Sequence, residues 1–262
     1  MIDIHSHILP HIDDGSRYIL KSVEDAKKAA REGITHMVLT LHHGVGTYRN
    51  TRGKILDATH RLHMRLHAER IPVKVLAGQQ PVIFENMIKG LESGELCTLA
   101  DRGQYLLIDL PKNSIPAFAA DELLTLQQHG IIPVLAQPEK NKAIQSDPNW
   151  LFDLVQSGIA VQLAAGSLLG DYGGSTKKFA YQLAKCGLTH FIGSDTHGGR
   201  KHRLQKAYQG IARKFGSRKV DYYKDNADLL IHSQHIERED PVRLSEKRVF
   251  LWTANNKYRF SD

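Results

Sequence analysis

Residues 1–15 read MIDIHSHILPHIDDG. Residues 2–4 have the apolar character of a very short buried strand, and His5 and His7 follow it directly. Side chains two positions apart on an extended chain point the same way, so these two imidazoles can hold one metal ion. Asp13 and Asp14 come next, at the turn before Gly15. The stretch predicts a metal site that begins here and is completed by polar residues at later strand ends.

Short apolar segments alternate with helical segments along the rest of the chain. We expect six further strands at residues 34–40, 73–77, 105–108, 131–136, 159–163 and 188–193, separated by helices such as 22–31, which Ser22 would cap. This alternation predicts a parallel sheet. Residues that can bind metal or phosphate follow the strands: His5 and His7, His42, Gln80, Asp109, Gln137, and Asp195 with His197. In a parallel barrel these ends share one face, where active sites are built.

We therefore predict an α/β fold with a single domain, a distorted TIM-like (β/α)7 barrel at residues 1–232. Its last helices are expected at 203–215 and at about 222–232. The C-terminal tail, 233–262, mixes charges with the apolar run VFLW at 249–252. This tail could dock on the barrel, on another subunit or on a membrane surface, or it could be loosely ordered.

Composition narrows the classes of function. No apolar run approaches the ~20 residues of a membrane span, and Met1 leads into a strand without the segments of a signal peptide. Cys97 and Cys186 are far apart and in no C-x-x-C pair, which argues against a disulfide framework and a thiolate zinc site. We expect a cytoplasmic protein. The net charge of +7 suggests an anionic partner, and its dispersion along the chain argues against nucleic acid.

The candidate ligands form a nitrogen and oxygen set without thiolate. They are His5, His7, Asp14, His42, Asp109, Asp195 and His197. Such a set suits Mn²⁺, Fe²⁺ or Zn²⁺ in a hydrolase. Two or three cations would clamp a phosphate group and generate hydroxide near neutral pH. A single histidine is usually structural, but the recurrence of these residues at strand ends predicts one shared site.

The chain resembles the polymerase-and-histidinol-phosphatase (PHP) superfamily. Within it, the chain is similar to the bacterial manganese-dependent protein-tyrosine phosphatases encoded with capsule and exopolysaccharide genes. The segments that carry the resemblance span about residues 1–232 in order: 1–7 with Asp13-Asp14-Gly15, 40–43, 78–80, 105–110, 133–141, 166–168 and 194–197. It implies the PHP barrel, a cluster of two or three divalent ions with Mn²⁺ favoured, and phosphotyrosine as substrate. The usual target is the tyrosine-rich tail of a partner tyrosine kinase that controls polysaccharide export.

The resemblance also assigns residues. Six match its metal-ligand positions: His5, His7, Asp14, His42, Asp195 and His197. Asp109 stands where the family usually has Glu. Arg200 matches a phosphate-contacting Arg, and Lys140 replaces another, keeping the charge without the bidentate fork. Gln80 and Gln137 stand where the family has a bridging Glu and a His, and neutral amides are poor ligands. We expect Gln80, Asp109 and Gln137 to line one metal position, whose ion is weakly bound or absent.

These departures leave several functions open. The favoured one is a metal-dependent protein-tyrosine phosphatase in which Arg200 and Lys140 stabilise the transferring phosphoryl group. His42, His43 or a water molecule could protonate the departing tyrosinate. A catalytically weakened relative that binds the kinase tail is one alternative, and a small-molecule phosphatase such as histidinol phosphatase is another. The sequence does not specify the oligomeric state.

Overall fold

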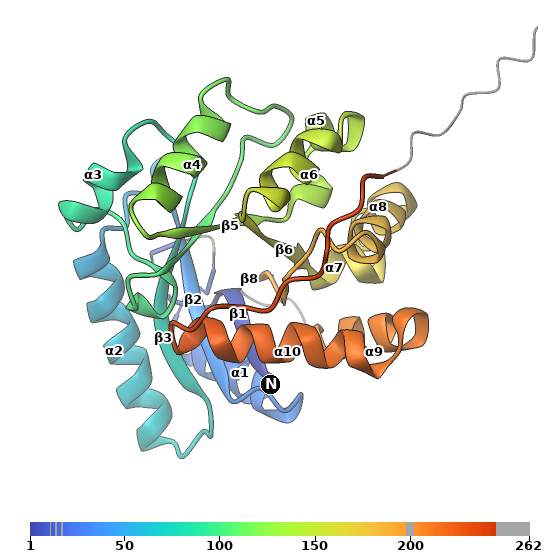
Figure 1. The fold of residues 1–262 in the computed structure, drawn as a ribbon. Helices are drawn as coiled ribbons and strands as arrows, with labels where there is room; N and C mark the ends of the chain where they lie inside the picture. The colour runs from blue at the N-terminus through green and yellow to red at the C-terminus, as the bar shows by residue number, and fades with distance from the viewer. Residues whose placement is uncertain (11, 14, 17, 198–201, 245–262) are drawn as a thin grey trace, which may run out of the picture.

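The computed structural model describes residues 1–10, 12–13, 15–16, 18–197 and 202–244. Strands alternate with helices along the described chain, as Figure 1 shows. The strands are β1 (Ile2–His7), β2 (His36–His43), β3 (Lys74–Pro81), β4 (Tyr105–Ile108), β5 (Ile132–Ala136), β6 (Ala160–Ala164), β7 (Phe191–Gly193) and β8 (Thr196–His197). The helices are α1 (Ile19–Arg31), α2 (Arg52–Ala68), α3 (Met87–Glu92), α4 (Ala119–Gln128), α5 (Lys142–Ser146), α6 (Asn149–Gln156), α7 (Ala165–Leu169), α8 (Gly174–Lys185), α9 (Leu204–Phe215) and α10 (Ser217–Ile231). Two short 3₁₀ helices, η1 (Leu99–Asp101) and η2 (Pro138–Lys140), complete the order.

The strands form two parallel sheets of four. The first has the order β3-β2-β1-β8 and the second the order β4-β5-β6-β7. The sheets meet at two margins: Val82 bridges Asp109, and the backbone N–H of Asp195 donates to the carbonyl of His5 at 2.9 Å. The predicted α/β class and parallel pairing are confirmed. The continuous ladder of the predicted seven-stranded barrel is instead divided between two sheets, and the short strand β8 is added after β7.

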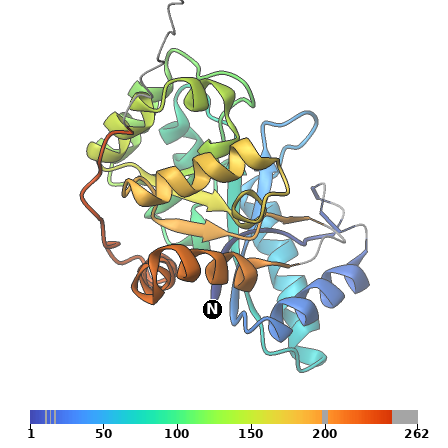
Figure 2. The ribbon, with the colours of Figure 1, turned by 90° about the vertical axis from the view of Figure 1, so that its right-hand side faces the viewer.

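Helices cover the outside of the sheets, and Figure 2 shows this layering from the side. Every residue of β1 and β6 is buried, as expected for strands with both faces covered. A separate inner cluster joins side chains of several strands, including Ile4, Val38 and Phe191, to Leu230 of α10. Because α10 packs against β1 and β7, this inner cluster is closed by a helix.

Two details differ from the sequence prediction or extend it. The first helix begins at Ile19, and Ser22 lies buried inside it, so the predicted cap at Ser22 is wrong. Ile19 packs against the core, which extends the helix toward the N-terminus. The described part of the predicted tail, residues 233–244, has no helix or strand but is hydrogen-bonded to the domain: the N–H of Val242 donates to the carbonyl of Cys186 at 2.8 Å. The apolar run at 249–252 lies outside the described residues, and the domain boundary at 232 stays a prediction.

None of the helices in the described ranges is both long enough and apolar enough to cross a lipid bilayer.

Candidate metal centre

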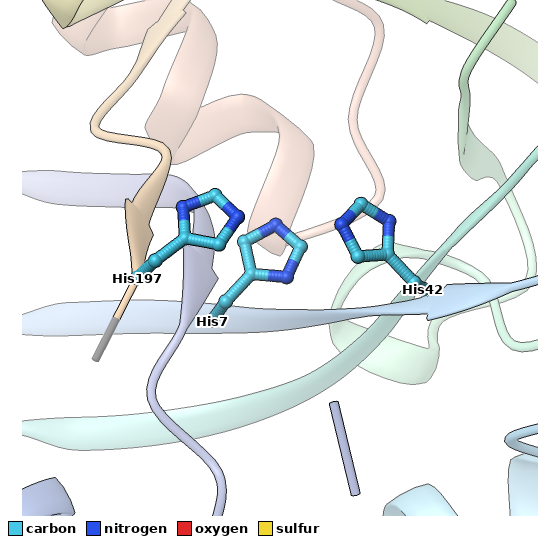
Figure 3. A group of neighbouring side chains, drawn as sticks. All are labelled: His7, His42 and His197. Atoms are coloured by element: carbon cyan, nitrogen blue, oxygen red, sulfur yellow. The ribbon is translucent and has the colours of Figure 1, made fainter. Parts of the chain in front are cut away.

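Sheet register brings the predicted histidines together. His5 and His7 alternate with Ser6 on β1, so both imidazoles lie on the same side of the strand. Strand β8 pairs with β1 in the register that sets His197 beside His7. His42 comes from the neighbouring strand β2, and Figure 3 shows the rings of His7, His42 and His197 side by side. Residues far apart in sequence therefore form one cluster.

The first group of candidate ligands consists of His5, His7 and Asp195. The Nε2 atoms of His5 and His7 lie 3.0 Å apart, and Oδ1 of Asp195 lies 3.5 Å and 3.9 Å from them, respectively. Oε1 of Gln80 is also 3.0 Å from Nε2 of His5. Ligands about 2.1 Å from a tetrahedral ion would be about 3.4 Å apart. The spacing of the His5, His7 and Asp195 atoms therefore suits one cation between them, and the Gln80 oxygen lies next to this group at His5.

Hydrogen bonds from behind orient both imidazoles toward that position. Nδ1 of His5 lies 2.9 Å from Oε1 of Gln162, and Nδ1 of His7 lies 2.7 Å from Oδ2 of Asp13. Each oxygen accepts a hydrogen bond when the imidazole carries its proton on Nδ1, and this tautomer leaves the Nε2 lone pair for a cation. Burial lowers the pKa of His5, which favours the neutral imidazole that metals bind. The donor set therefore fits a divalent metal ion.

A second group consists of His7, His42 and His197. The ring centroids of His7 and His197 lie 4.3 Å apart in a stacked pair, and those of His7 and His42 lie 4.6 Å apart. Burial lowers the pKa of His42 and of His197 to about 4, so both are neutral at pH 7. With Nδ1 of His7 facing Asp13, its remaining nitrogen can serve one ion only, so the two groups are neighbouring positions that compete for His7. Asp14, another predicted metal ligand, lies outside the described residues.

The three residues predicted to line a further metal position lie near His5 or in a neighbouring cavity. Asp109, Gln137 and Lys140 line a cavity of about 490 Å³ with the apolar side chains of Val82 and Leu110, whereas Gln80 faces His5. Nε2 of Gln137 lies 3.4 Å from Nδ1 of His5. Burial raises the pKa of Asp109 to about 6. Within the described ranges, Asp109 joins no group of three His, Cys, Asp or Glu ligand atoms.

Lys140 contacts the metal centre through Asp195. Its Nζ lies 2.8 Å from Oδ2 of Asp195 and 3.9 Å from the centroid of the Tyr172 ring. Burial alone would lower the pKa of Lys140, but attraction to the Asp195 carboxylate raises it. Burial alone would raise the pKa of Asp195, but the nearby His5 and Lys140 lower it. The carboxylate thus offers Oδ1 to the imidazoles while Oδ2 is held by an ammonium. Arg200, the other predicted phosphate contact, lies outside the described residues.

Three features of the site were not foreseen from the sequence. Asp13, read only as a turn residue, accepts from His7, and its Oδ2 also accepts from the backbone N–H of His42 at 2.9 Å. Gln162, the one polar residue of the strand AVQLA, contacts His5. A polar residue in an otherwise apolar strand was the sequence feature that could have indicated this contact. Asp195 and Gln137 both adopt left-handed backbone, with φ of 53° and 50°, a conformation that non-glycine residues keep mainly where surrounding structure imposes it.

A buried ion pair between Asp3 and His202 lies close in sequence to the candidate ligands His5 and Asp195. Oδ2 of Asp3 lies 2.8 Å from Nε2 of His202, while Oδ1 of Asp3 accepts from the backbone N–H of Ser194 at 2.9 Å. Against the effect of burial, hydrogen bonds to Asp3 and Glu32 raise the pKa of His202 to about 9. Asp3 therefore ties the start of β1 to the residues on both sides of the segment that carries Asp195.

The family model for capsular polysaccharide synthesis, CpsB/CapC, matches residues 1–232. The chain belongs to this family. It is 37% identical over 252 residues to the tyrosine-protein phosphatase YwqE of Bacillus subtilis (strain 168), covering 95% of this chain and 99% of that protein. It is 32% identical to the putative tyrosine-protein phosphatase CapC of Staphylococcus aureus over 93% of this chain and 96% of that protein.

Comparison with solved structures extends the similarity to three dimensions. A structure from work on YwqE of Bacillus subtilis and CpsB of Streptococcus pneumoniae, described as unique metal-dependent tyrosine phosphatases, superposes with a TM-score of 0.90. The match has 37% identity and covers 94% of this chain and 100% of that one. A histidinol phosphate phosphatase of Lactococcus lactis superposes with a TM-score of 0.54 at 13% identity, over 84% of this chain and 94% of that one, which shows a shared fold.

Proposed function

We propose that this chain is a metal-dependent phosphatase that hydrolyses phosphotyrosine on proteins. The observation that carries the proposal is the convergence of Nε2 of His5, Nε2 of His7 and Oδ1 of Asp195 on one point, where Gln162 and Asp13 contact the Nδ1 atoms of the two imidazoles from behind. Membership of the CpsB/CapC family supports the reaction, because its relatives YwqE and CapC carry the name tyrosine-protein phosphatase.

The metal is proposed to be Mn²⁺, with Fe²⁺ or Zn²⁺ also compatible with nitrogen and oxygen donors. His5, His7 and Asp195 would hold one ion, and His42 with His197 would contribute to a second. Divalent ions bound there would supply hydroxide near neutral pH and would offset the charge of a phosphate group. Asp14 and Asp109 remain proposed ligands, the first outside the described residues and the second apart from both groups.

Lys140 is proposed to attract and hold the phosphate dianion. Its ammonium is fixed between the Asp195 carboxylate and the Tyr172 ring at the margin of the 490 Å³ cavity, so it needs little rearrangement to face a bound anion. His42, with a pKa of about 4, is a neutral imidazole at pH 7, which suits it to ligation better than to protonating a leaving group. Arg200 stays a proposed second phosphate contact.

The proposed substrate in the cell is the tyrosine-rich tail of a bacterial tyrosine kinase, and the proposed compartment is the cytoplasm. The family description, capsular polysaccharide synthesis, supports a role in that process. Residues 1–232 are proposed to form the catalytic domain, which agrees with the span of the family match.

A weakened relative that only binds the kinase tail is the second candidate, because Gln80 and Gln137 bring neutral amides to the centre. Phosphate release from p-nitrophenyl phosphate and from a phosphotyrosine peptide, with added Mn²⁺, separates the two. We expect turnover by the unaltered protein. An inactive protein that becomes active in the double variant Gln80→Glu/Gln137→His would establish the weakened alternative instead.

A further inference from the structure

A second cavity, of about 380 Å³, lies beside the metal centre and is lined by basic side chains. Arg49, Lys54 and Arg61 line it, and Asp57 is the one carboxylate among its described lining residues. The guanidinium of Arg49 donates to the carbonyl of Tyr48 at 2.9 Å, and the ammonium of Lys54 donates to the carbonyl of Arg49 at 3.2 Å. Within the described part of the chain, no carboxylate forms an ion pair with any of the three cations. Among the described residues, the charge of these three cations is therefore largely uncompensated.

Asn50 fixes this basic cavity in place relative to the metal centre. Asn50 lines the cavity, and its Nδ2 donates to the carbonyls of Ile12 at 3.0 Å and of His42 at 2.9 Å. The ring of Tyr48, another lining residue, stacks with that of His42 at a centroid distance of 6.4 Å. The cavity thus begins one side chain away from a candidate metal ligand.

Helix α2 supports the same electrostatic reading. Lys54 lies in its first turn, which contains no acidic residue. The dipole of a helix disfavours cations at its N-terminus and favours anions there. Arg52 in the same turn is compensated by Asp101, whose Oδ1 lies 2.7 Å from its Nε. For Lys54 the partner found within the described ranges is the carbonyl of Arg49. Helix stability does not account for Lys54, whereas an anionic ligand beside the turn would benefit from both the ammonium and the dipole.

We propose that this basic cavity binds an anionic side chain of the substrate polypeptide, next to the phosphotyrosine that is hydrolysed; the proposal rests on the proposed function. An extended chain advances about 3.3–3.6 Å per residue, so a side chain about two positions from the phosphotyrosine spans the step from His42 to Tyr48. Glutamate, aspartate or a second phosphotyrosine supplies the charge, and the second phosphotyrosine, with its larger charge, binds most tightly. The site then prefers acidic or multiply phosphorylated tyrosine-rich chains.

The test uses the full-length protein loaded with Mn²⁺ and two phosphotyrosine peptides that differ only at the positions two residues to either side, Glu in one and Gln in the other. The variant Lys54→Glu/Arg61→Glu reverses the cavity charge. The matched control, Lys74→Glu/Arg218→Glu, makes the same change in net charge at the exposed start of β3 and in the first turn of α10. Steady-state kinetics give KM and kcat, and fluorescence anisotropy gives peptide affinity without turnover.

We expect the unaltered protein and the control to favour the Glu peptide in KM by about tenfold, with similar kcat for the two peptides. The cavity variant should lose that preference while keeping its kcat on p-nitrophenyl phosphate. Equal KM for both peptides in the unaltered protein, or a preference that survives in the cavity variant, overturns the cavity while leaving the phosphatase in place. A protein that turns over neither peptide overturns the proposed function, and anisotropy then decides the cavity by the same comparison.

Discussion

Replacing Asp13 by Asn should weaken metal binding at the centre. The side chain of Asp13 is fully buried. Its carboxylate accepts hydrogen bonds from Nδ1 of His7 at 2.7 Å and from the backbone N–H of His42 at 2.9 Å. Interaction with His7 and His42 holds the pKa of Asp13 well below its usual range despite burial, so the group is ionised. The substitution keeps the size of the side chain and removes its charge.

The size of the effect follows from the bond that is weakened. A hydrogen bond to a charged group contributes roughly 1.5–3 kcal/mol and a neutral one about 0.5–1.5 kcal/mol. The difference, about 1–1.5 kcal/mol, corresponds to roughly a tenfold change in affinity, the lower end of the roughly 10- to 100-fold loss that follows when the partner of a metal-binding histidine is altered. We therefore expect Asp13→Asn to raise the Kd for Mn²⁺ by about 10- to 100-fold.

Isothermal titration of Mn²⁺ into metal-free protein measures this Kd directly. Asp228→Asn is the matched control, because Asp228 lies on α10 with a side chain 61% exposed. Far-ultraviolet circular dichroism checks that each variant is folded. A folded Asp13→Asn protein whose Kd stays within about twofold of the control would refute the role of Asp13 in orienting His7.

Other predictions follow from the same contacts. The pKa of His202 is about 9 in the folded protein and roughly 6.5 in an unfolded chain, so its ion pair with Asp3 stabilises the folded protein fully below pH 6.5. About 3 kcal/mol of the free energy of unfolding is lost as pH rises through 9. Urea unfolding at pH 6 and pH 10 should show this loss, and the variant His202→Gln should show a smaller difference between the two pH values. A Cβ at Gly193 would lie 2.5 Å from Cβ of His5, so Gly193→Ala should displace His5 and weaken Mn²⁺ binding at least about tenfold by calorimetry; unchanged binding would contradict this packing. Lys140→Met should lower kcat/KM on a phosphotyrosine peptide by about 10- to 100-fold, and Lys140→Arg should restore part of it; equal losses in both variants would argue against a role for the charge.

The sequence predicted the ligands at strand ends because a parallel sheet brings such ends together regardless of their separation in the chain. His5 and His7 alternate on β1, and the pairing of β1 with β8 sets His197 beside His7. The sequence also showed Gln80 at a position where the resemblance predicts Glu, and the structure places the amide oxygen of Gln80 against His5.

Other features depended on tertiary contacts that no local pattern encodes. The pair between Asp3 and His202 joins residues 199 positions apart, and Gln162 reaches His5 across 157 positions. Asp195 has a left-handed backbone, and its N–H donates to the carbonyl of His5. Because such a conformation is usually signalled by glycine in a sequence, the aspartate at this position gave no local sign of it. The division of the strands into two sheets likewise depends on the limited hydrogen bonding between β3 and β4, where one bridge joins Val82 to Asp109.

The most direct test of the central claim is phosphate release from a phosphotyrosine peptide by metal-stripped protein, before and after Mn²⁺ is restored, with bound metal counted by elemental analysis. The convergence of His5, His7 and Asp195 predicts no turnover without metal and full recovery when Mn²⁺ is bound. His7→Ala, which removes the imidazole shared by both ligand groups, should lose the bound metal and the turnover together. Turnover that persists in metal-free protein, or bound Mn²⁺ that yields no phosphate from any phosphotyrosine peptide, would contradict the account.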